Sequence, residues 1–159
     1  ILEEIKRHPK FVLSGVNMNW CEEILSKMKK QRMKDTSSAL GYATVSTAMN
    51  LDAKCILVPT GSGATARVIS KFQPKMDVLA VSPNARTLRR MQIYWGVRPY
   101  ESMQFETTEA ICGNAIALAK EKNYLETGDI ALLTAGIPSP HVGGFDYGVS
   151  NMMRIVTIE

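Results

Sequence analysis

The stretch that decides the fold is Cys55–Thr65, CILVPTGSGAT. Its first residues are apolar and β-forming, its middle is a turn of Thr, Ser and Gly, and a helical pattern begins directly after it. A strand, a glycine-rich loop and a helix start in this order leave several backbone N–H groups without partners and directed at one point. The positive end of the helix dipole lies there too, so the stretch predicts a loop that holds a phosphate or another anion.

Strands and single helices alternate from this loop onward. The predicted strands are Cys55–Val58, Val78–Val81, Val97–Tyr100, Ile130–Ala135 and Met153–Ile158. The predicted helices are Ala64–Phe72, one from Ser82 or Asn84 to Tyr94 that stops at a left-handed Gly96, and one from a cap at Thr107 to about Lys122. This order predicts a three-layer α/β/α domain with about five strands, mostly parallel. The last strand follows no crossover helix, so we expect it to be antiparallel at an edge.

Two further helices are predicted before the loop. Apolar residues at helical spacing predict an amphipathic helix over Asn19–Met33. The other runs from caps at Thr36–Ser38 to Asn50, made slim by Ala39, Gly41 and Ala48, with a buried face of Leu40, Ala43, Thr47 and Leu51. We therefore divide the chain into an N-terminal helical segment or linker, residues 1–35, and an α/β domain, residues 36–159.

Composition excludes several classes of protein. The 159 residues are 45% hydrophobic and 21% charged, as in a soluble globular domain, and no apolar run approaches the ~20 residues that cross a bilayer. Cys21, Cys55 and Cys112 are odd in number and far apart, which disfavours a disulfide framework and a metal site. We interpret Cys55 and Cys112 as buried hydrophobes and expect a reducing, cytoplasmic location.

The formal net charge is +4, with a basic cluster at Lys27, Lys29, Lys30, Arg32 and Lys34. Basic clusters can bind nucleic acid, but no stacking aromatic residue lies near this one. We interpret it as the solvated face of a helix and expect neither a nucleic-acid nor a membrane partner. The chain opens on Ile1, within helix-like sequence, which favours the hypothesis that it is a fragment of a longer protein.

The glycine-rich loop supplies the candidate binding residues Thr60, Gly61, Ser62, Gly63, Ala64 and Thr65. Hydroxyls of Thr60, Ser62 and Thr65 can donate to an oxyanion, and glycines let the backbone approach it closely. The structural alternative is a simple strand-to-helix turn whose Ser and Thr cap the helix. Three hydroxyls and two glycines in six residues exceed what capping needs, so we favour anion binding.

Two sharper phosphate motifs do not fit. The Walker A motif ends in Gly-Lys-Ser/Thr, whereas Ala64-Thr65 follows Gly63 here. Gly61–Ala66 satisfies the loose G-x-G-x-x-A dinucleotide pattern, but no acidic residue ends the next strand to bind a ribose, which disfavours a dinucleotide site. Arg86 could contact a second phosphate; alternatively Arg86, Arg89 and Arg90 form the exposed side of a helix.

No catalytic constellation is recognisable. The only histidines are His8 and His141, and no nucleophile motif, metal-protease motif or carboxylate pair at a strand end occurs. We therefore predict no catalytic residue in this chain. The Gly/Pro-rich segment Gly136–Gly148 is long for a connection, which is typical of functional loops.

Five motifs in this order resemble the C-terminal domain of pyruvate kinase. They lie in TSSALGYATVSTAMNLDAKCILVPTGSGATARVISKFQP, VLAVSPNARTLRRMQIYWGVRPY, GDIALLTAGIPSP and GVSNMMRIVTI. The family shows a small-residue helix, a Ser/Thr-x-Ser-Gly-x-Thr-Ala-Arg loop, an Asn-led helix ending in Gly-Val-x-Pro, a Gly-Asp strand, and a final Thr-Asn-x-Met-like strand. The resemblance spans Thr36–Ile158.

The resemblance implies a regulatory, subunit-assembling domain. In the family, phosphoryl transfer from phosphoenolpyruvate to ADP, with Mg²⁺ and K⁺, occurs in a preceding barrel domain, so this chain alone is expected to be inactive and without a cofactor. The loop Thr60–Thr65 would hold a phosphate of a sugar-phosphate effector. The segment Gly136–Gly148, with Gly136, His141, Gly143 and Gly144, would close over that effector. The parent is expected to be a glycolytic homotetramer.

Departures from the family pattern bear on the effector. Members that respond to fructose 1,6-bisphosphate often carry Trp and Arg before the Thr107 helix and in the late loop. This chain has Met103–Glu106 at the first place and no arginine in the second. A second phosphate would lack its guanidinium partner, which favours a monophosphate such as AMP or ribose 5-phosphate.

Two alternatives stay open at the level of sequence. The first is a stand-alone structural or interaction module with a vestigial phosphate loop. The second is a small enzyme acting on sugar phosphates or nucleotides, with His141 as general base, which requires His141 within ~3 Å of a labile proton or one water away.

Overall fold

A five-stranded sheet, in the order β3-β2-β1-β4-β5, organises the described part of the chain. The computed structural model describes residues 36–103, 107–135 and 151–159. The predicted helix over Asn19–Met33 lies outside these ranges. The strands are β1 (Cys55–Pro59), β2 (Asp77–Ser82), β3 (Val97–Glu101), β4 (Ile130–Ala135) and β5 (Met152–Thr157).

The sheet is parallel except at one edge. β1 pairs with β2 and β4 in parallel, and β2 pairs with β3 in parallel. β5 pairs antiparallel with β4, with Ile130 opposite Thr157, which confirms the predicted antiparallel edge strand. From β1 the chain first builds outward to β2 and β3 and then returns to place β4 on the other side of β1. Strand order therefore reverses between the paired neighbours β1 and β4.

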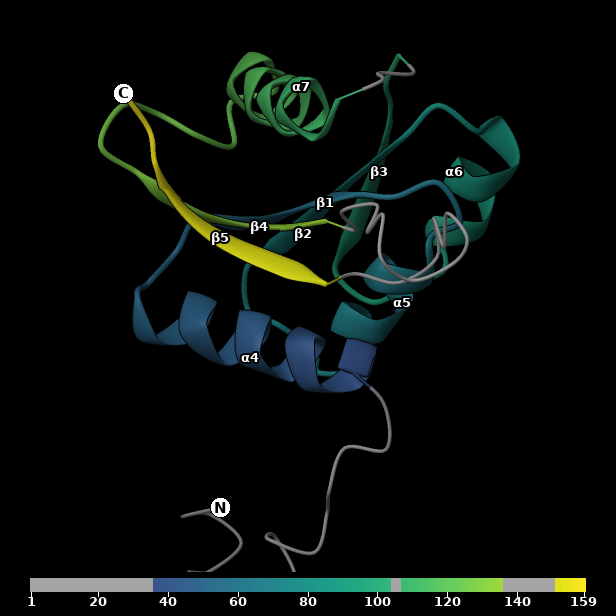
Figure 1. Ribbon diagram of the computed structural model, residues 1–159, viewed down its shortest axis with the longest axis horizontal. Helices are drawn as coiled ribbons and strands as arrows, with labels where there is room; N and C mark the ends of the chain where they lie inside the picture. The colour runs from purple at the N-terminus through teal and green to yellow at the C-terminus, as the bar shows by residue number, and fades with distance from the viewer. Residues whose placement is uncertain (1–35, 104–106, 136–150) are drawn as a thin grey trace, which may run out of the picture. The chain divides into compact units, whose positions relative to one another are not determined.

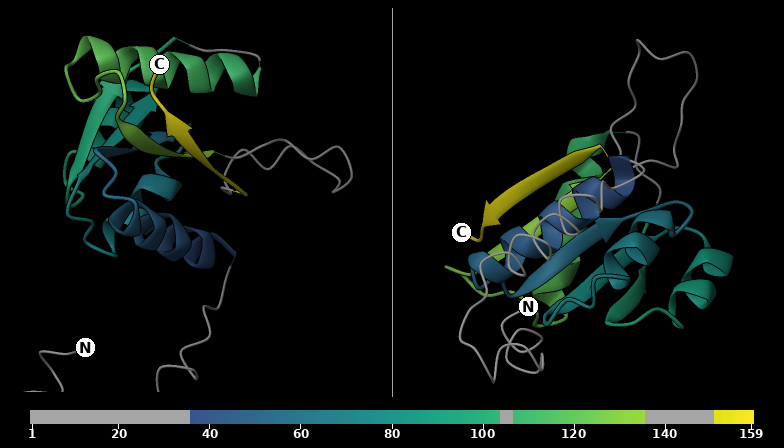
Figure 2. Two further views of the ribbon diagram at one scale, coloured as in Figure 1. Left: turned by 90° about the vertical axis from the view of Figure 1, so that its left-hand side faces the viewer. Right: turned by 90° about the horizontal axis from the view of Figure 1, so that it is seen from below.

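Helices cover both faces of the sheet, which confirms the three-layer prediction. They are α4 (Thr36–Asn50), α5 (Ala64–Ser70), α6 (Ala85–Met91) and α7 (Thr108–Glu121). Figures 1 and 2 show α7 on one side of the sheet and α4 on the other. Among the described residues, no helix is both long and apolar enough to span a membrane.

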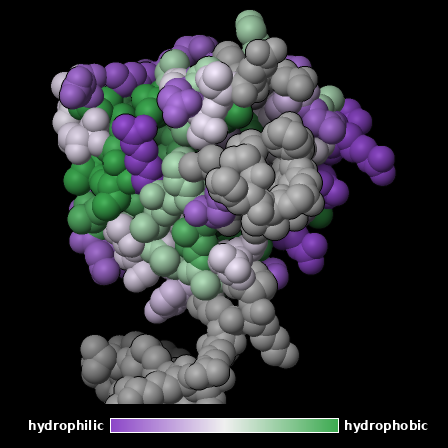
Figure 3. Space-filling model, viewed as in Figure 1, coloured by the Kyte–Doolittle hydropathy of each residue, from purple (hydrophilic) through white to green (hydrophobic). Residues whose placement is uncertain are grey.

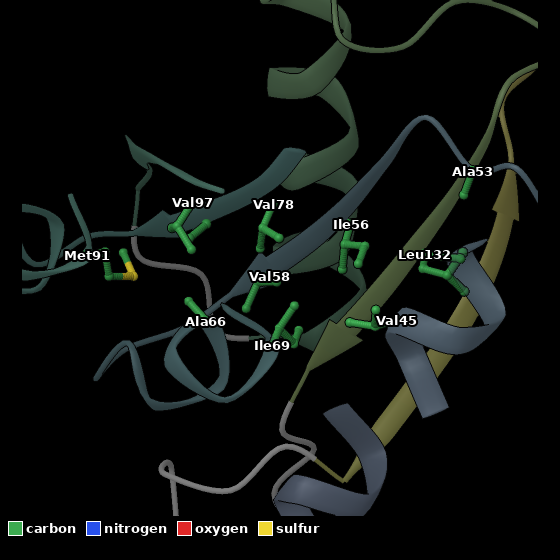
Figure 4. Close-up of a cluster of buried hydrophobic side chains, with 12 residues drawn as sticks. Val45, Ala53, Ile56, Val58, Ala66, Ile69, Val78, Met91, Val97 and Leu132 are labelled. Atoms are coloured by element: carbon green, nitrogen blue, oxygen red, sulfur yellow. The ribbon is translucent and has the colours of Figure 1, made fainter. Parts of the chain in front are cut away.

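The two faces of the central strands bury separate clusters of side chains. Alternate residues of β1 point to opposite faces: Ile56 and Val58 pack with α4, α5 and α6, whereas Cys55 and Leu57 pack with α7. Figure 4 shows the first cluster, in which Ile69 of α5 and Val45 of α4 lie against the sheet. Burial on both faces explains why β1, β2 and β4 read as nearly continuous apolar runs.

The predicted buried face of α4 is wrong. Gly41, Thr44, Val45 and Ala48 are buried, in place of the expected Leu40, Ala43, Thr47 and Leu51. Small residues allow α4 to approach α5 closely, since a Cβ built on Gly41 would lie 2.7 Å from Val68 Cγ1. Thr44 is buried without an unpaired hydroxyl because its Oγ1 donates to the carbonyl of Leu40 at 2.8 Å. The prediction of a slim helix is confirmed.

Side-chain caps fix the starts of two helices as predicted. Asn84 Oδ1 accepts the N–H of Arg86 at 2.9 Å and that of Thr87 at 3.4 Å, and Thr107 Oγ1 accepts the N–H of Ala110 at 3.2 Å. The predicted helix to Tyr94 is too long, because α6 ends at Met91 and a turn follows. Gly96 in this turn has φ +68, the left-handed conformation expected for it.

Candidate functional site

The glycine-rich loop leaves the carboxyl end of β1, the central strand of the sheet. The N–H of Thr60 donates to the carbonyl of Val81 at 2.9 Å, so the loop begins beside the end of β2. On the other side β4 ends at Ala135, at the same edge. The loop therefore lies at the reversal of strand order, the place where open α/β sheets bind ligands.

Hydroxyls and amides of the loop bond to one another. The N–H of Gly63 donates to Thr60 Oγ1 at 2.9 Å, and the N–H of Ala64 donates to Ser62 Oγ at 3.3 Å. Both amides belong to residues that the sequence predicts to bind a phosphate. Each hydroxyl acts as acceptor here and keeps its own hydrogen as a donor. The N-cap of α5 is Gly63, which makes no side-chain cap bond, so these two bonds lie within the turn itself. Phosphate binding stays a prediction.

The two loop glycines have different environments. Gly63 is buried with φ +77, and a Cβ there would lie 3.1 Å from Met91 Cγ and 3.3 Å from Thr87 Cγ2. Gly61 is exposed, and a Cβ built on it would have no heavy atom within 4 Å. Glycine is thus required at 63 by both conformation and space. Gly61, Ser62 and Ala64 form the open side of the loop.

Two α6 side chains hold the loop, and sequence reasoning did not assign them to it. Thr87 Oγ1 donates to the carbonyl of Gly61 at 2.9 Å, and the Arg90 guanidinium donates to the carbonyl of Ser62. All three arginines of α6 are exposed, as in the alternative given for them, and Arg90 is the one for which a bond to the loop is seen. Local sequence gives no signal for these contacts, which follow from the parallel pairing of β1 with β2 that brings the starts of α5 and α6 to one edge. Figure 1 shows α5 and α6 gathered there.

The remaining candidate residues belong to the segment 136–148. Gly136, His141, Gly143 and Gly144 lie outside the described residues. Within the described ranges, no cluster of three or more His, Cys, Asp or Glu residues could hold a metal ion.

The two described cysteines are buried, as predicted, and poorly suited to nucleophilic chemistry. Burial, with smaller contributions from Asp129 and Asp77, raises the pKa of Cys55 to about 12. Burial also raises the pKa of Cys112, against the opposing charge of Arg154. Since the thiolate is the reactive form, both thiols are unreactive near neutral pH.

Fold and loop together define a mostly parallel α/β domain with a glycine-rich loop at its strand-order reversal. The family model described as pyruvate kinase, alpha/beta domain, matches residues 38–156. The chain therefore belongs to the pyruvate kinase α/β domain family.

Curated proteins and solved structures that are similar to this chain are also pyruvate kinases. The pyruvate kinases of Staphylococcus saprophyticus and Staphylococcus epidermidis are each 35% identical over 153 residues, which is 96% of this chain and 25% of theirs. The structure of Cryptosporidium parvum pyruvate kinase in complex with ADP superposes with a TM-score of 0.69 at 31% identity, over 79% of this chain and 24% of that one. This chain thus spans about a quarter of the length of the curated relatives it matches.

Proposed function

We propose that this chain is the regulatory and subunit-assembling domain of a pyruvate kinase, and that its loop Thr60–Thr65 binds a phosphate group of an effector. The observation that supports the proposal most directly is that the loop follows the carboxyl end of β1, one of the two strands at which strand order reverses. Ser62 is exposed there, and its hydroxyl and that of Thr60 keep a hydrogen to donate. β4 ends with Ala135 at the same edge, which suits the proposal that the following segment closes over the ligand.

The catalytic reaction belongs, in this proposal, to other parts of the parent protein. The parent would transfer a phosphoryl group from phosphoenolpyruvate to ADP in glycolysis, with Mg²⁺ and K⁺ bound outside this chain. The free thiols Cys55 and Cys112 fit a reducing, cytoplasmic location for that parent. An effector would act by binding one arrangement of the subunits more tightly than another, which shifts their populations.

The effector that fits best is a sugar or nucleoside monophosphate. The loop offers neutral hydroxyls and amides for one phosphate, and its six residues carry no charged side chain. A second phosphate needs a further cationic partner, and the sequence places no arginine in the segment 136–150. Ribose 5-phosphate and AMP therefore precede fructose 1,6-bisphosphate in the expected order of affinity.

Isothermal titration of the chain with these three phosphates tests the loop. Replacing Ser62 and Thr65 together by alanine should weaken binding by at least about 100-fold, because each of the two lost hydrogen bonds to a charged group contributes ~1.5–3 kcal/mol. Thr157→Ala, which removes an exposed hydroxyl from β5, should leave the affinity unchanged. Absence of binding heat for all three phosphates would contradict the effector proposal.

A structural module with a vestigial loop is the second candidate. The paired amides of Gly63 and Ala64 favour it, since a loop whose polar groups bond to one another needs no ligand. In that case the Ser62 and Thr65 double variant would change neither ligand affinity nor subunit assembly.

We propose that the parent assembles as a homotetramer. The support for this part of the proposal is a surface formed by α4 and β5. Large hydrophobic side chains are exposed on α4, where Tyr42 is 54% and Met49 45% exposed, and on β5, where Ile155 is 51% exposed. Figure 3 shows hydrophobic surface where the end of α4 lies beside the sheet. Exposed apolar side chains on neighbouring elements suit a contact with another subunit.

A further inference from the structure

Three consecutive loop residues contact α6. Thr87 Oγ1 donates to the carbonyl of Gly61 at 2.9 Å, and the Arg90 guanidinium donates to the carbonyl of Ser62. Gly63 packs against Met91 and the methyl group of Thr87, with so little space that a Cβ would be crowded. Thr87 is 5% exposed, so its hydroxyl bond is made in a largely water-free environment.

Holding a carbonyl also fixes the next amide. In a trans peptide the C=O of one residue and the N–H of the following residue point in opposite directions. Since Thr87 and Arg90 draw the carbonyls of Gly61 and Ser62 toward α6, the amides of Ser62 and Gly63 must point away from α6. The Gly63 amide does so and reaches Thr60 Oγ1.

We infer that Thr87 and Arg90, here called the α6 anchor, are positioning residues that set the conformation of the glycine-rich loop. The loop sequence does not do this alone: Gly61 lies in open space and glycine has the widest conformational freedom. The anchor removes that freedom and turns the amides of Ser62 and Gly63 to the side of the loop that faces away from α6. Arg90 also brings to the loop a positive charge that its own six residues lack.

The two anchoring bonds differ in how easily they open. Thr87 is buried on the inner side of α6, so little water can compete for its hydroxyl. Arg90 is exposed, and its guanidinium can leave the Ser62 carbonyl for an anion without any change in α6. We therefore assign to Thr87 the permanent part of the anchor and to Arg90 the exchangeable part.

Amide hydrogen exchange, measured by NMR on the ¹⁵N-labelled chain, tests the anchor without any ligand. Thr87→Val keeps the shape of the side chain but removes the hydroxyl, and it should accelerate exchange of the Gly63 amide at least fivefold, because one hydrogen bond contributes about 1 kcal/mol. Thr87→Ser restores the hydroxyl and should return the rate to the wild-type value. Exchange of Leu57 in β1 reports global unfolding, so only the acceleration at Gly63 that exceeds the one at Leu57 is assigned to the loop.

Arg90→Leu provides an independent variant, because it alters an exposed residue and leaves the core intact. It should accelerate Gly63 exchange severalfold, whereas Arg89→Leu, the matched loss of one exposed arginine from the same helix, should not. If Gly63 exchange stays within twofold of wild type in both Thr87→Val and Arg90→Leu, or rises equally in Arg89→Leu, the inference is overturned.

The role of the anchor in ligand binding rests on the proposed function, and titration with inorganic phosphate separates the two. If wild type binds phosphate, Thr87→Val should weaken it roughly tenfold and Thr87→Ser should restore it. If wild type binds none, the proposed function loses its support, while the exchange rates still decide whether the anchor sets the loop.

Discussion

A glycine in α4 is needed for packing, whereas a glycine in α7 is not. On α4, Gly41 faces Val68 and Phe72, and a Cβ there would lie 2.7 Å from Val68 Cγ1 and 3.3 Å from Phe72 Cε2. On α7, Gly113 is exposed and a Cβ would have no heavy atom within 4 Å. Gly41 is therefore required by packing, whereas Gly113 only weakens its helix.

Alanine at these two positions should change stability in opposite directions. Gly113→Ala should raise the free energy of unfolding by about 0.5–1 kcal/mol through helix propensity. Gly41→Ala gains the same propensity but overpacks the contact with α5, so we expect a net loss of about 1 kcal/mol. Urea unfolding monitored by circular dichroism measures both. Adding Val68→Ala should make Gly41→Ala favourable; a loss that persists in that background would show that Val68 is not the cause.

Cys55 offers a prediction about chemical reactivity. Its pKa is raised to about 12 from an ordinary value of 9.0, first by burial and then by Asp129 and Asp77. Iodoacetamide at pH 8 should therefore leave Cys55 unmodified in the folded chain and alkylate it fully in urea, as mapped by mass spectrometry. Equal rates in the two conditions would contradict the burial of this thiol.

The same shift has a consequence for stability. A thiol whose pKa is higher in the folded than in the unfolded state favours folding while it is protonated in both. This contribution is complete below about pH 9 and is lost as the pH rises from 9 toward 12. Cys55→Ala should therefore lose less stability than wild type over that interval.

At the scale of elements, α6 is a short helix whose position depends on its cap. Asn84 accepts two N–H groups at its start, and Ser82 Oγ accepts the N–H of Asn84 at 3.2 Å, which ties the cap to the end of β2. Seven residues form few internal hydrogen bonds, so such a helix depends on capping and packing.

Asn84→Ala should lower the free energy of unfolding by about 1 kcal/mol, the usual cost of losing a cap, whereas Asn84→Asp should keep most of it. Thermal unfolding of the three proteins provides the measurement. Because α6 carries Thr87 and Arg90, Asn84→Ala should also accelerate amide exchange at Gly63. Stability equal to wild type would mean that water replaces the cap.

Sequence reasoning succeeded where one physical rule dominated. Apolar runs bounded by turns gave all five strands, and the capping residues Asn84 and Thr107 gave the starts of α6 and α7. It failed on α4, where apolar periodicity predicted Leu40 and Leu51 inside. Close packing there favours Gly41 and Thr44, which a hydrophobicity pattern scores as polar or neutral.

The contacts of the glycine-rich loop could not be predicted from sequence either. Its position after β1 follows from local sequence, but its contacts with Thr87 and Arg90 are 26 and 28 residues apart in the chain. Such contacts depend on which strands become neighbours, and single-sequence patterns do not encode register. The pairing of Gly63 with Thr60 was equally hidden, because the same hydroxyl suits a cap or a ligand.

At the scale of the whole molecule, the domain exposes apolar side chains that a subunit contact would cover. Replacing Ile155, 51% exposed on the edge strand β5, by glutamate should shift sedimentation equilibrium of the chain toward monomer. Ile93→Glu is the matched control, since Ile93 is 82% exposed in the turn after α6. A monomeric wild type, or an equal shift in both variants, would count against assembly through this surface.

The antiparallel direction of β5 places Glu159 near the start of β4. The N–H of Ile158 donates to the carbonyl of Asp129 at 2.9 Å, just before β4 begins, and Lys120 Nζ donates to the carbonyl of Glu159 at 2.7 Å. Glu159 therefore sits at the opposite end of the sheet from the glycine-rich loop, as the C label in Figure 1 shows. A fluorophore or fusion partner attached to Glu159 would consequently report tumbling and titration of the domain without obstructing Ser62.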